Sequence, residues 1–333
     1  MVGYLERLIH HQDEPIADWV CIPLYFVSKL AHDSGITVVQ VGEGSDEQFA
    51  GYDFYMTYLR MHRNVWQPFE RYVPSMLRPA IGASARAVGR NIRGLAVKAD
   101  FIDRAARGRE MFWNGAMSFW DIDKEQVLPG ARMPRPEVPA ALVDCGMLPR
   151  EYLEPDTFGV VRSILEPLDA AHPGLDPLTR MIYTELRVRL PELLLMRVDK
   201  IAMSVSLEGR VPFLDHSLVD FTMDIPMADK VRGNEPKRLL KRAAEGWIPQ
   251  EIIERKKMGF GAPMALWLRG EFGARVEREI LASPLMQRGW FETDFVRTLC
   301  AEHRSGRRDN SLHLWTLFNL TAWYDYWVAG TPH

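Results

Sequence analysis

Apolar residues recur every three or four positions along most of the chain, a spacing typical of amphipathic helices. We expect a helix over residues 23–35, one that begins at Pro191, one over residues 237–244 and a buried C-terminal helix within residues 312–328. Proline is tolerated in a first helical turn, which favours a start at Pro191. Polar residues inside the last segment argue against a membrane span. The helix after Pro191 has an apolar face of Leu194, Val198, Ile201 and Val205.

Residues 36–41 form a short β-branched run, the one convincing strand in the pattern. The run is apolar along its length, which is typical of a central strand in a parallel sheet covered on both faces. From residue 52 to residue 330 the pattern predicts helices, and prolines between residues 100 and 180 predict short ones. A buried backbone group without a partner costs about 1 to 3 kcal/mol. We therefore expect the partner strands upstream of Met1, and hence an incomplete α/β domain.

The composition of the chain is that of a globular protein with a small net charge. Hydrophobic residues make up 47% and charged residues 26% of the chain, both near the average for folded domains. The net charge of -3 gives no overall field that would attract nucleic acid. Basic residues crowd residues 78–109 without a nucleic-acid motif, so we expect a solvated helical face there. Three widely spaced cysteines and residues 1–11 without a signal-peptide pattern predict a reducing, cytoplasmic setting.

The segment Gly42–Glu47, with the sequence Gly-Glu-Gly-Ser-Asp-Glu, is the sharpest chemical signal. Its glycines let backbone N–H groups approach a phosphate or an adenylate closely. Its three carboxylates would repel one another unless a cation lay among them, and a magnesium-bound nucleotide would supply that cation. The alternative is an ordinary acidic turn that caps the next helix.

Two further charged segments are open to two interpretations each. Residues 197–200 and 206–216 join a helix to a charged turn, where the charges could line a site or simply pair with one another. Lys237 and Lys241, together with the Gly-rich residues 255–263, could bring a lysine to phosphate oxygens or could be merely solvated.

Taken together and in order, these segments resemble the synthetase domain of the glutamine-hydrolysing asparagine synthetases. The resemblance covers nearly the whole chain. It implies an α/β fold of the adenine nucleotide alpha hydrolase-like (ATP pyrophosphatase) type, with an incomplete parallel sheet and a predominantly helical C-terminal part. Residues 1–60 would then belong to the nucleotide-binding core and residues 61–333 to the helical remainder. The matching motifs are Asp13–Asp18, Ile22–Tyr25, Gly42–Glu47, Arg210–His216 and Gly259–Gly261.

Members of this family use ATP and Mg²⁺ to adenylate a carboxylate, usually the aspartate side chain, which ammonia from glutamine then attacks. The resemblance implies that Glu43 and Lys257 are catalytic and that Asp46 helps to hold Mg²⁺. It assigns nucleotide contacts to Val41, Gly42, Gly44 and Ser45. Supporting positions in the pocket fall on Arg197, Asp199, Lys200, Glu208, Arg210 and Lys237. Small molecules are the expected partners, with a homodimer left as an option and neither nucleic acid nor a membrane expected.

Three departures from the family pattern matter. Val41 stands where the family usually has Ser, the pyrophosphatase loop Ser-Gly-Gly-x-Asp-Ser does not occur in the sequence, and Val2 occupies the position of a glutaminase Cys. We therefore expect ATP chemistry to need a separate glutaminase or N-terminal half, because of a split gene, a misassigned start codon or a decayed fragment. Two alternatives remain: a tailoring amidotransferase or ligase of polysaccharide or peptide biosynthesis, and a non-catalytic partner of a complete synthetase.

Overall fold

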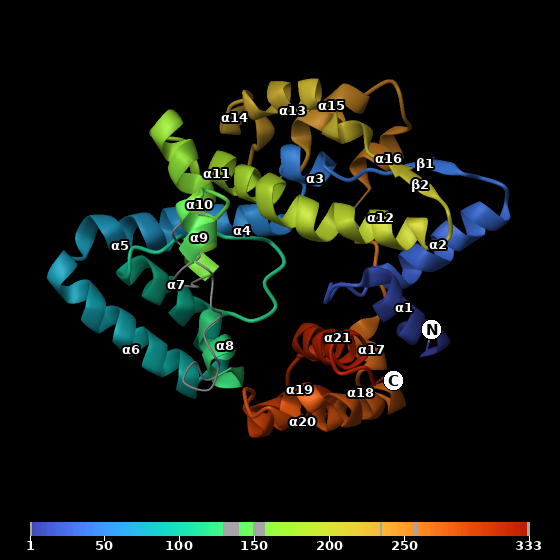
Figure 1. Cartoon of the computed structure of the whole chain (residues 1–333). Coiled ribbons are helices and arrows are strands. Elements are labelled where there is room, and N and C mark those ends of the chain that lie inside the picture. The colour runs from blue at the N-terminus through green and yellow to red at the C-terminus, as the bar shows by residue number, and fades with distance from the viewer. Residues whose placement is uncertain (1, 129–139, 149–156, 234, 256–258, 332–333) are drawn as a thin grey trace.

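The computed structural model describes residues 2–128, 140–148, 157–233, 235–255 and 259–331. Most of these residues are helical, and one small parallel sheet lies at the edge of the molecule (Figure 1). In the part of the chain so described, every helix is too short or too polar to span a bilayer. Cys21, Cys145 and Cys300 are free, as the sequence predicts.

The N-terminal half of the chain begins with two helices, one strand and a series of short helices. The predicted helix over residues 23–35 is confirmed as α2. The elements are α1 (Val2–Gln12), α2 (Cys21–Asp33), β1 (Val38–Gln40), α3 (Ser45–Gln48), α4 (Asp53–Met61), η1 (His62–Trp66), α5 (Gln67–Tyr72), η2 (Ser75–Leu77), α6 (Arg78–Asn91), η3 (Arg93–Leu95), α7 (Ala96–Ala106), α8 (Asp121–Val127), α9 (Ala140–Asp144) and α10 (Thr157–Ala171).

The C-terminal half contains the second strand and a largely buried C-terminal helix. The predicted helices over residues 237–244 and within residues 312–328 are confirmed as α15 and α21. The elements are α11 (Pro177–Thr184), η5 (Glu185–Leu195), α12 (Met196–Met203), β2 (Glu208–Arg210), η6 (Pro212–Leu214), α13 (His216–Met223), α14 (Met227–Lys230), α15 (Arg238–Ala244), α16 (Gln250–Glu254), α17 (Met264–Trp267), α18 (Glu271–Ala282), α19 (Pro284–Gln287), α20 (Thr293–Arg304) and α21 (Ser311–Trp327).

Strands β1 and β2 pair in parallel, with Val38, Val39 and Gln40 opposite Glu208, Gly209 and Arg210. The expectation that every partner of β1 lies upstream of Met1 is therefore wrong for β2, which follows about 170 residues later in the chain. The sequence Glu-Gly-Arg contains no β-branched or aromatic residue and so gives no strand signal. Gly209 lets β2 approach its neighbours, because a Cβ there would lie 3.1 Å from Val198 Cγ1.

The predicted burial of β1 on both faces is wrong among the described residues. Val38 and Gln40 are exposed and Val39 is half-buried. The backbone N–H of Val41 donates to Arg210 O at 2.7 Å, and that of Glu208 donates to Thr37 O at 2.9 Å. Parallel strands alternate their backbone groups, so those of Val38 and Gln40 point away from β2. In the part of the chain that the structure describes, no third strand pairs with either edge of this two-stranded sheet.

Elements α11, η5 and α12 form one continuous helical rod from Pro177 to Met203. The predicted helix start at Pro191 is wrong, because Pro191 lies inside the π-helical segment η5. A wider turn accommodates a residue that lacks a backbone N–H. Beyond it, Leu194, Val198 and Ile201 are buried as predicted, and Val205 is partly buried.

Two hydrophobic clusters lie at the two ends of this rod. The C-terminal cluster gathers α1, α2 and the last helices around Ile201 of α12. The central cluster gathers α4, α7 and the loop after α7 around Leu178, Met181 and Ile182 of α11. Residues of the C-terminal cluster include Leu8, Ile22, Trp315 and Phe318, and residues of the central cluster include Tyr55, Tyr58, Phe101 and Phe112.

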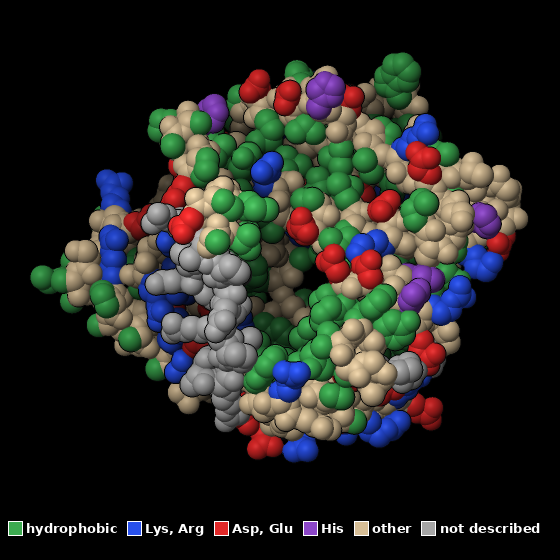
Figure 2. Space-filling view, viewed as in Figure 1, with side chains coloured by type: hydrophobic (Ala, Val, Ile, Leu, Met, Phe, Trp, Pro, Cys, Tyr) green, Lys and Arg blue, Asp and Glu red, His purple; other side chains and the backbone are tan. Residues whose placement is uncertain are grey.

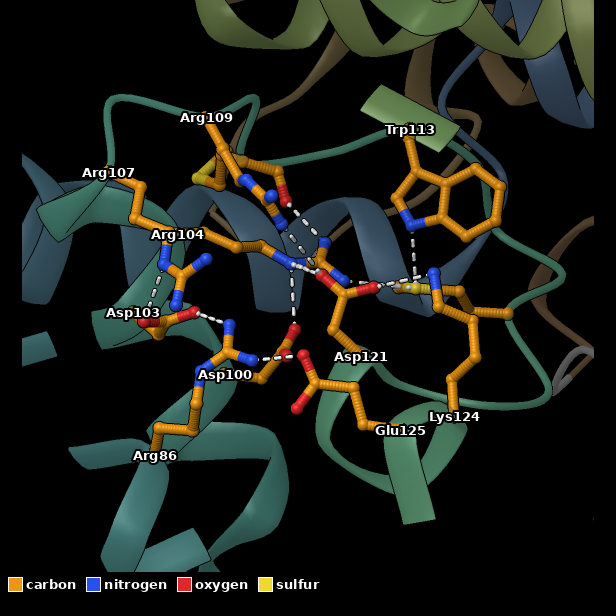
Figure 3. A network of polar contacts seen from close by, with 12 residues as sticks. Arg86, Asp100, Asp103, Arg104, Arg107, Arg109, Trp113, Asp121, Lys124 and Glu125 are labelled. Atoms are coloured by element: carbon orange, nitrogen blue, oxygen red, sulfur yellow. Dashed lines mark hydrogen bonds and ion pairs between the residues drawn. The ribbon is translucent and has the colours of Figure 1, made fainter. Parts of the chain in front are cut away.

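The basic segment 78–109 is not simply a solvated face, which corrects the sequence interpretation. Helix α6 packs closely on α7 and α8, because Gly82 and Gly89 leave no room for a Cβ. Arg86 and Arg104 are consequently buried, and they reach a group of carboxylates on α7 and α8 (Figure 3). Arg104 Nε lies 2.7 Å from Asp100 Oδ2, and Arg86 pairs with Asp103 and Glu125.

Candidate active site

The loop after β1 turns sharply into α3 at Gly44. Gly44 has φ +92°, a left-handed conformation, and a Cβ at this position would overlap the side chain of Leu214. Only glycine meets both demands without strain. The Ser45 hydroxyl donates to Gly42 O at 2.9 Å, and Gln48 Nε2 donates to Gly44 O at 3.2 Å. The loop is thus held from within, while space beside Gly42 stays open.

This loop forms one wall of a cavity of about 850 Å³. The other walls come from the segment before α2, the 115–118 loop, the rod and the start of α21. Figure 2 shows a hollow in the middle of one face, with acidic and basic side chains near its rim. Charged residues that line the cavity are Asp18, Glu43, Asp46, Arg189 and Arg197; apolar ones include Trp19, Leu24, Val27, Leu193 and Phe260.

Glu43 is paired with Arg197 of the rod. Arg197 Nη2 donates to Glu43 Oε1 at 2.7 Å, and its Nη1 donates to Asp18 Oδ2 at 2.5 Å. Burial raises the pKa of Glu43, and the Arg197 guanidinium partly opposes that rise. A carboxylate with a raised pKa is a better proton acceptor in the neutral range than an exposed one.

Asp46 is paired with Lys237, which comes from a distant part of the chain. Lys237 Nζ lies 3.0 Å from Asp46 Oδ1 and donates to Ser45 Oγ at 2.9 Å. Lys237 has φ +54°, an unusual backbone conformation just before α15, and its backbone N–H donates to Phe49 O at 3.2 Å. Gly51 makes room for the pair, since a Cβ there would overlap both side chains.

A second arginine, Arg189, lies on the wall formed by η5. Its guanidinium lies over the ring of Tyr52, 4.6 Å from the ring centroid, and its Nη1 donates to Glu185 Oε2 at 2.7 Å. Glu185 is buried and also accepts the backbone N–H of Gly115 at 2.6 Å. Neither Arg189 nor Glu185 was predicted from the sequence, although a spacing of four residues on a helix is the signal of an ion pair.

A family model for asparagine synthase matches residues 1–325. The chain belongs to the asparagine synthase family. It is 29% identical over 321 residues to asparagine synthetase [glutamine-hydrolyzing] 1 of Bacillus subtilis, an alignment that covers 96% of this chain and 45% of the relative. It is 30% identical over 329 residues to a putative asparagine synthetase [glutamine-hydrolyzing] of Mycobacterium tuberculosis, covering 98% of this chain and 45% of the relative.

More distant similarity extends to proteins with another name. Amidase chry2 of Gibberella zeae is 22% identical over 301 residues, which cover 88% of this chain and 42% of the amidase. The chain thus spans about half the length of the curated relatives that it matches. No solved structure matches it.

The carboxylates that line the cavity would suit a magnesium ion only if a ligand supplied further oxygen atoms to it. Among the described residues, no three His, Cys, Asp or Glu side chains converge to hold a metal ion. Asp46 faces the cavity but is paired with Lys237. Magnesium usually takes one or two protein carboxylates together with phosphate oxygens and water. The donor set therefore suits a metal ion that arrives with a nucleotide.

The structure brings several predicted residues together and leaves others apart. Val41, Gly42, Glu43, Asp46 and Arg197 line the cavity. Gly44 and Ser45 lie behind that wall as turn and helix start.

The remaining supporting residues lie outside the cavity lining. Asp199 is exposed on α12, and Lys200 contacts Asp13 and donates to Gln12 O at 2.9 Å. Glu208 and Arg210 pair with each other at 2.9 Å on the exposed strand β2. Lys257 lies outside the described residues, although Gly259 and Phe260, which follow it closely, line the cavity.

Proposed function

We propose that this chain is a module of an ATP-dependent amidotransferase that adenylates a carboxylate, the aspartate side chain, for attack by ammonia. AMP and pyrophosphate would be released. The observation that carries the proposal is the meeting of the Gly42–Asp46 loop with Arg197 at one cavity in a chain of the asparagine synthase family. The small parallel sheet that precedes the loop is compatible with an adenine nucleotide alpha hydrolase-like core.

The residues of this chain divide into two groups in the proposed reaction. Open space beside Gly42 suits the close approach of a nucleotide to the backbone, with Val41, Gly44 and Ser45 shaping that wall. Asp46 would hold Mg²⁺, which would neutralise phosphate charge, and Lys237 keeps the Asp46 carboxylate in place. Glu43 would accept a proton from ammonium and so release the ammonia that attacks, because burial raises its pKa while Arg197 limits that rise. Lys257 would stabilise charge that develops on the phosphate and acyl groups.

Further parts of the proposal concern what lies outside this chain. Ammonia would come from a glutaminase on another polypeptide or segment, in the cytoplasm. The open edge of β1 suits an added parallel strand, since the backbone groups of Val38 and Gln40 point away from β2. The chain could also act as a homodimer, and a measurement of its molecular mass in solution would decide this.

The direct test is pyrophosphate release that depends on aspartate, ammonia, ATP and Mg²⁺. We expect release from this chain when an upstream segment of a relative that carries the Ser-Gly-Gly-x-Asp-Ser loop is supplied, fused or in trans. Glu43→Gln should abolish the ammonia-dependent release while the variant stays folded, although loss of the ion pair with Arg197 should lower its melting temperature. The proposal is wrong if the extended protein binds no Mg·ATP and releases no pyrophosphate.

A second candidate keeps the chemistry but changes the carboxylate. The apolar walls around Trp19, Leu24 and Leu193 offer more apolar surface than the aspartate side chain can use. Such walls favour a larger acyl substrate of polysaccharide or peptide biosynthesis. A panel of carboxylates, scored by pyrophosphate release, separates the two: a larger apolar acid that outcompetes aspartate would favour this second candidate.

A further inference from the structure

Arg189 occupies a position in the cavity that differs from that of Arg197. Arg197 points its two nitrogens at Asp18 and Glu43, which both line the cavity themselves. The carboxylate partner of Arg189 is Glu185, which is buried behind the wall and does not line the cavity. Among the described cationic residues of the lining, Arg189 is therefore the one whose carboxylate partner lies outside the cavity.

The guanidinium of Arg189 lies over an aromatic surface. It lies 4.6 Å from the Tyr52 ring centroid and 5.9 Å from that of Phe54. The Tyr52 ring is fixed in turn, because its hydroxyl donates to Glu47 Oε1 at 2.6 Å. Stacking of this kind leaves the edge of a guanidinium free to donate, and that edge matches the two oxygens of a carboxylate.

Glu185 fixes the direction of this edge. Its Oε2 accepts from Arg189 Nη1, and its Oε1 accepts from the backbone of Gly115 on the facing loop. A single buried carboxylate thus sets the arginine and the 115–118 wall relative to each other. Such a group costs desolvation energy, which its two partners offset.

Arg189 also lies on the side of the cavity where acyl chemistry is proposed. It is close enough to Glu43 to help lower the pKa of that carboxyl group. Lys237, by contrast, contacts Asp46 and Ser45 at the start of α3, the side proposed for phosphate groups. Arg189 therefore lines the cavity on the Glu43 side, whereas Lys237 lies behind Asp46, outside the lining.

We propose that Arg189 binds a carboxylate of the acyl substrate, one that does not react, and that Glu185 is the positioning residue that aims it. This inference rests on the proposed function and names a recognition residue for it. The site would select substrates that carry a second anionic group beside the carboxylate to be activated. L-aspartate has such a group in its α-carboxylate.

The test measures binding rather than turnover, so it does not require an active enzyme. L-aspartate and, separately, pyrophosphate are titrated by calorimetry into the 333-residue chain and its variants in the presence of Mg²⁺. We expect Arg189→Met to weaken L-aspartate binding about 10- to 100-fold, the loss typical of a hydrogen bond to a charged group. Pyrophosphate affinity should stay within about twofold. Arg189→Lys should fall between the wild type and Arg189→Met, because it keeps the charge without the planar edge.

Glu185→Gln tests whether Glu185 positions Arg189. It should weaken L-aspartate binding while leaving pyrophosphate binding intact, an asymmetry that general loss of structure would not produce. Arg187→Met is the matched control, because Arg187 is exposed on the same helical segment and does not line the cavity. Its affinities should equal those of the wild type.

The outcomes separate this inference from the proposed function. Arg189→Met with wild-type affinity for L-aspartate overturns the inference, as does a variant that loses pyrophosphate instead, which would assign Arg189 to phosphate. A wild-type chain that binds pyrophosphate but not L-aspartate also overturns it and leaves the nucleotide half of the proposed function standing. Binding of neither ligand would remove both.

Discussion

Two opposing effects set the charge of Glu43. Burial raises its pKa above the ordinary 4.5, and Arg197 at 2.7 Å lowers it. If Glu43 accepts a proton during turnover, activity should rise with pH through this raised pKa. Arg197→Met should then move that acidic limb to higher pH, and Arg197→Lys should move it less.

The measurement is the pH profile of pyrophosphate release in the extended protein. Asp18 is also left without its arginine in Arg197→Met, so Asp18→Asn serves as the control and should leave the position of the limb close to that of the wild type. An acidic limb that stays in place after Arg197→Met would contradict the assignment of Glu43 as the titrating group.

Gly44 and Gly42 form a matched pair for testing the loop. Gly44→Ala should lower the free energy of unfolding by about 2 to 4 kcal/mol, because it adds left-handed strain to an overlap with Leu214. Gly42→Ala should fold normally, since an added Cβ there meets no neighbour within 4 Å. Its methyl group should instead reduce nucleotide affinity. Urea unfolding and nucleotide binding of both variants check this, and equal stability losses would refute it.

Only those parts of the candidate site that are formed by residues adjacent in the sequence could be predicted. The loop from Val41 to Asp46 is visible in the sequence because its glycines and carboxylates are adjacent. Arg189 could not be recognised in the sequence, because its proposed role depends on the ring of Tyr52 beneath it and on Gly115 from a facing loop. The roles assigned to Lys257 and to the supporting residues remain predictions.

Among the elements, the helices were the most predictable part of the fold. The periodicity that predicts α2, α15 and α21 reflects burial of one helical face, which is a local property of the sequence. Strand β2 and the π-helical turn around Pro191 were missed, because one is three residues long without strand formers and the other breaks the helical period. Both depend on tertiary packing.

The pair of helices α7 and α8 carries a buried carboxylate that should make stability depend on pH. Burial raises the pKa of Asp100 from 3.8 to about 6, although Arg104 opposes the rise. The folded state therefore holds a proton more tightly than the unfolded state. The contribution of Asp100 to stability is full below about pH 4 and is lost as the pH rises through 6, by about 3 kcal/mol in total.

Urea unfolding between pH 4 and pH 7.5 measures this contribution. Asp100→Asn stays uncharged at every pH, so it should lose the part of the pH dependence described above. Asp294→Asn, a change at an exposed position on α20, should keep the wild-type dependence. An unchanged slope in Asp100→Asn would rule out this origin.

The whole molecule should protect two of its three thiols. Cys145 is exposed, whereas burial raises the pKa of Cys21 to about 12 and that of Cys300 to about 11. We expect one thiol to react rapidly with Ellman's reagent at pH 8 in the native protein and all three in denaturant. Cys145→Ser should abolish the rapid reaction. Rapid reaction of a second thiol would mean that one of the clusters opens easily.

The rod from Pro177 to Met203 also connects distant parts of the molecule. It is roughly 40 Å long at helical rise, with its ends embedded in different hydrophobic clusters and its wide-turned middle beside the cavity. Arg189 projects from that middle, and Arg197 projects from the first turn of α12 that follows it. A ligand bound to either arginine therefore contacts the helical element that connects the two clusters.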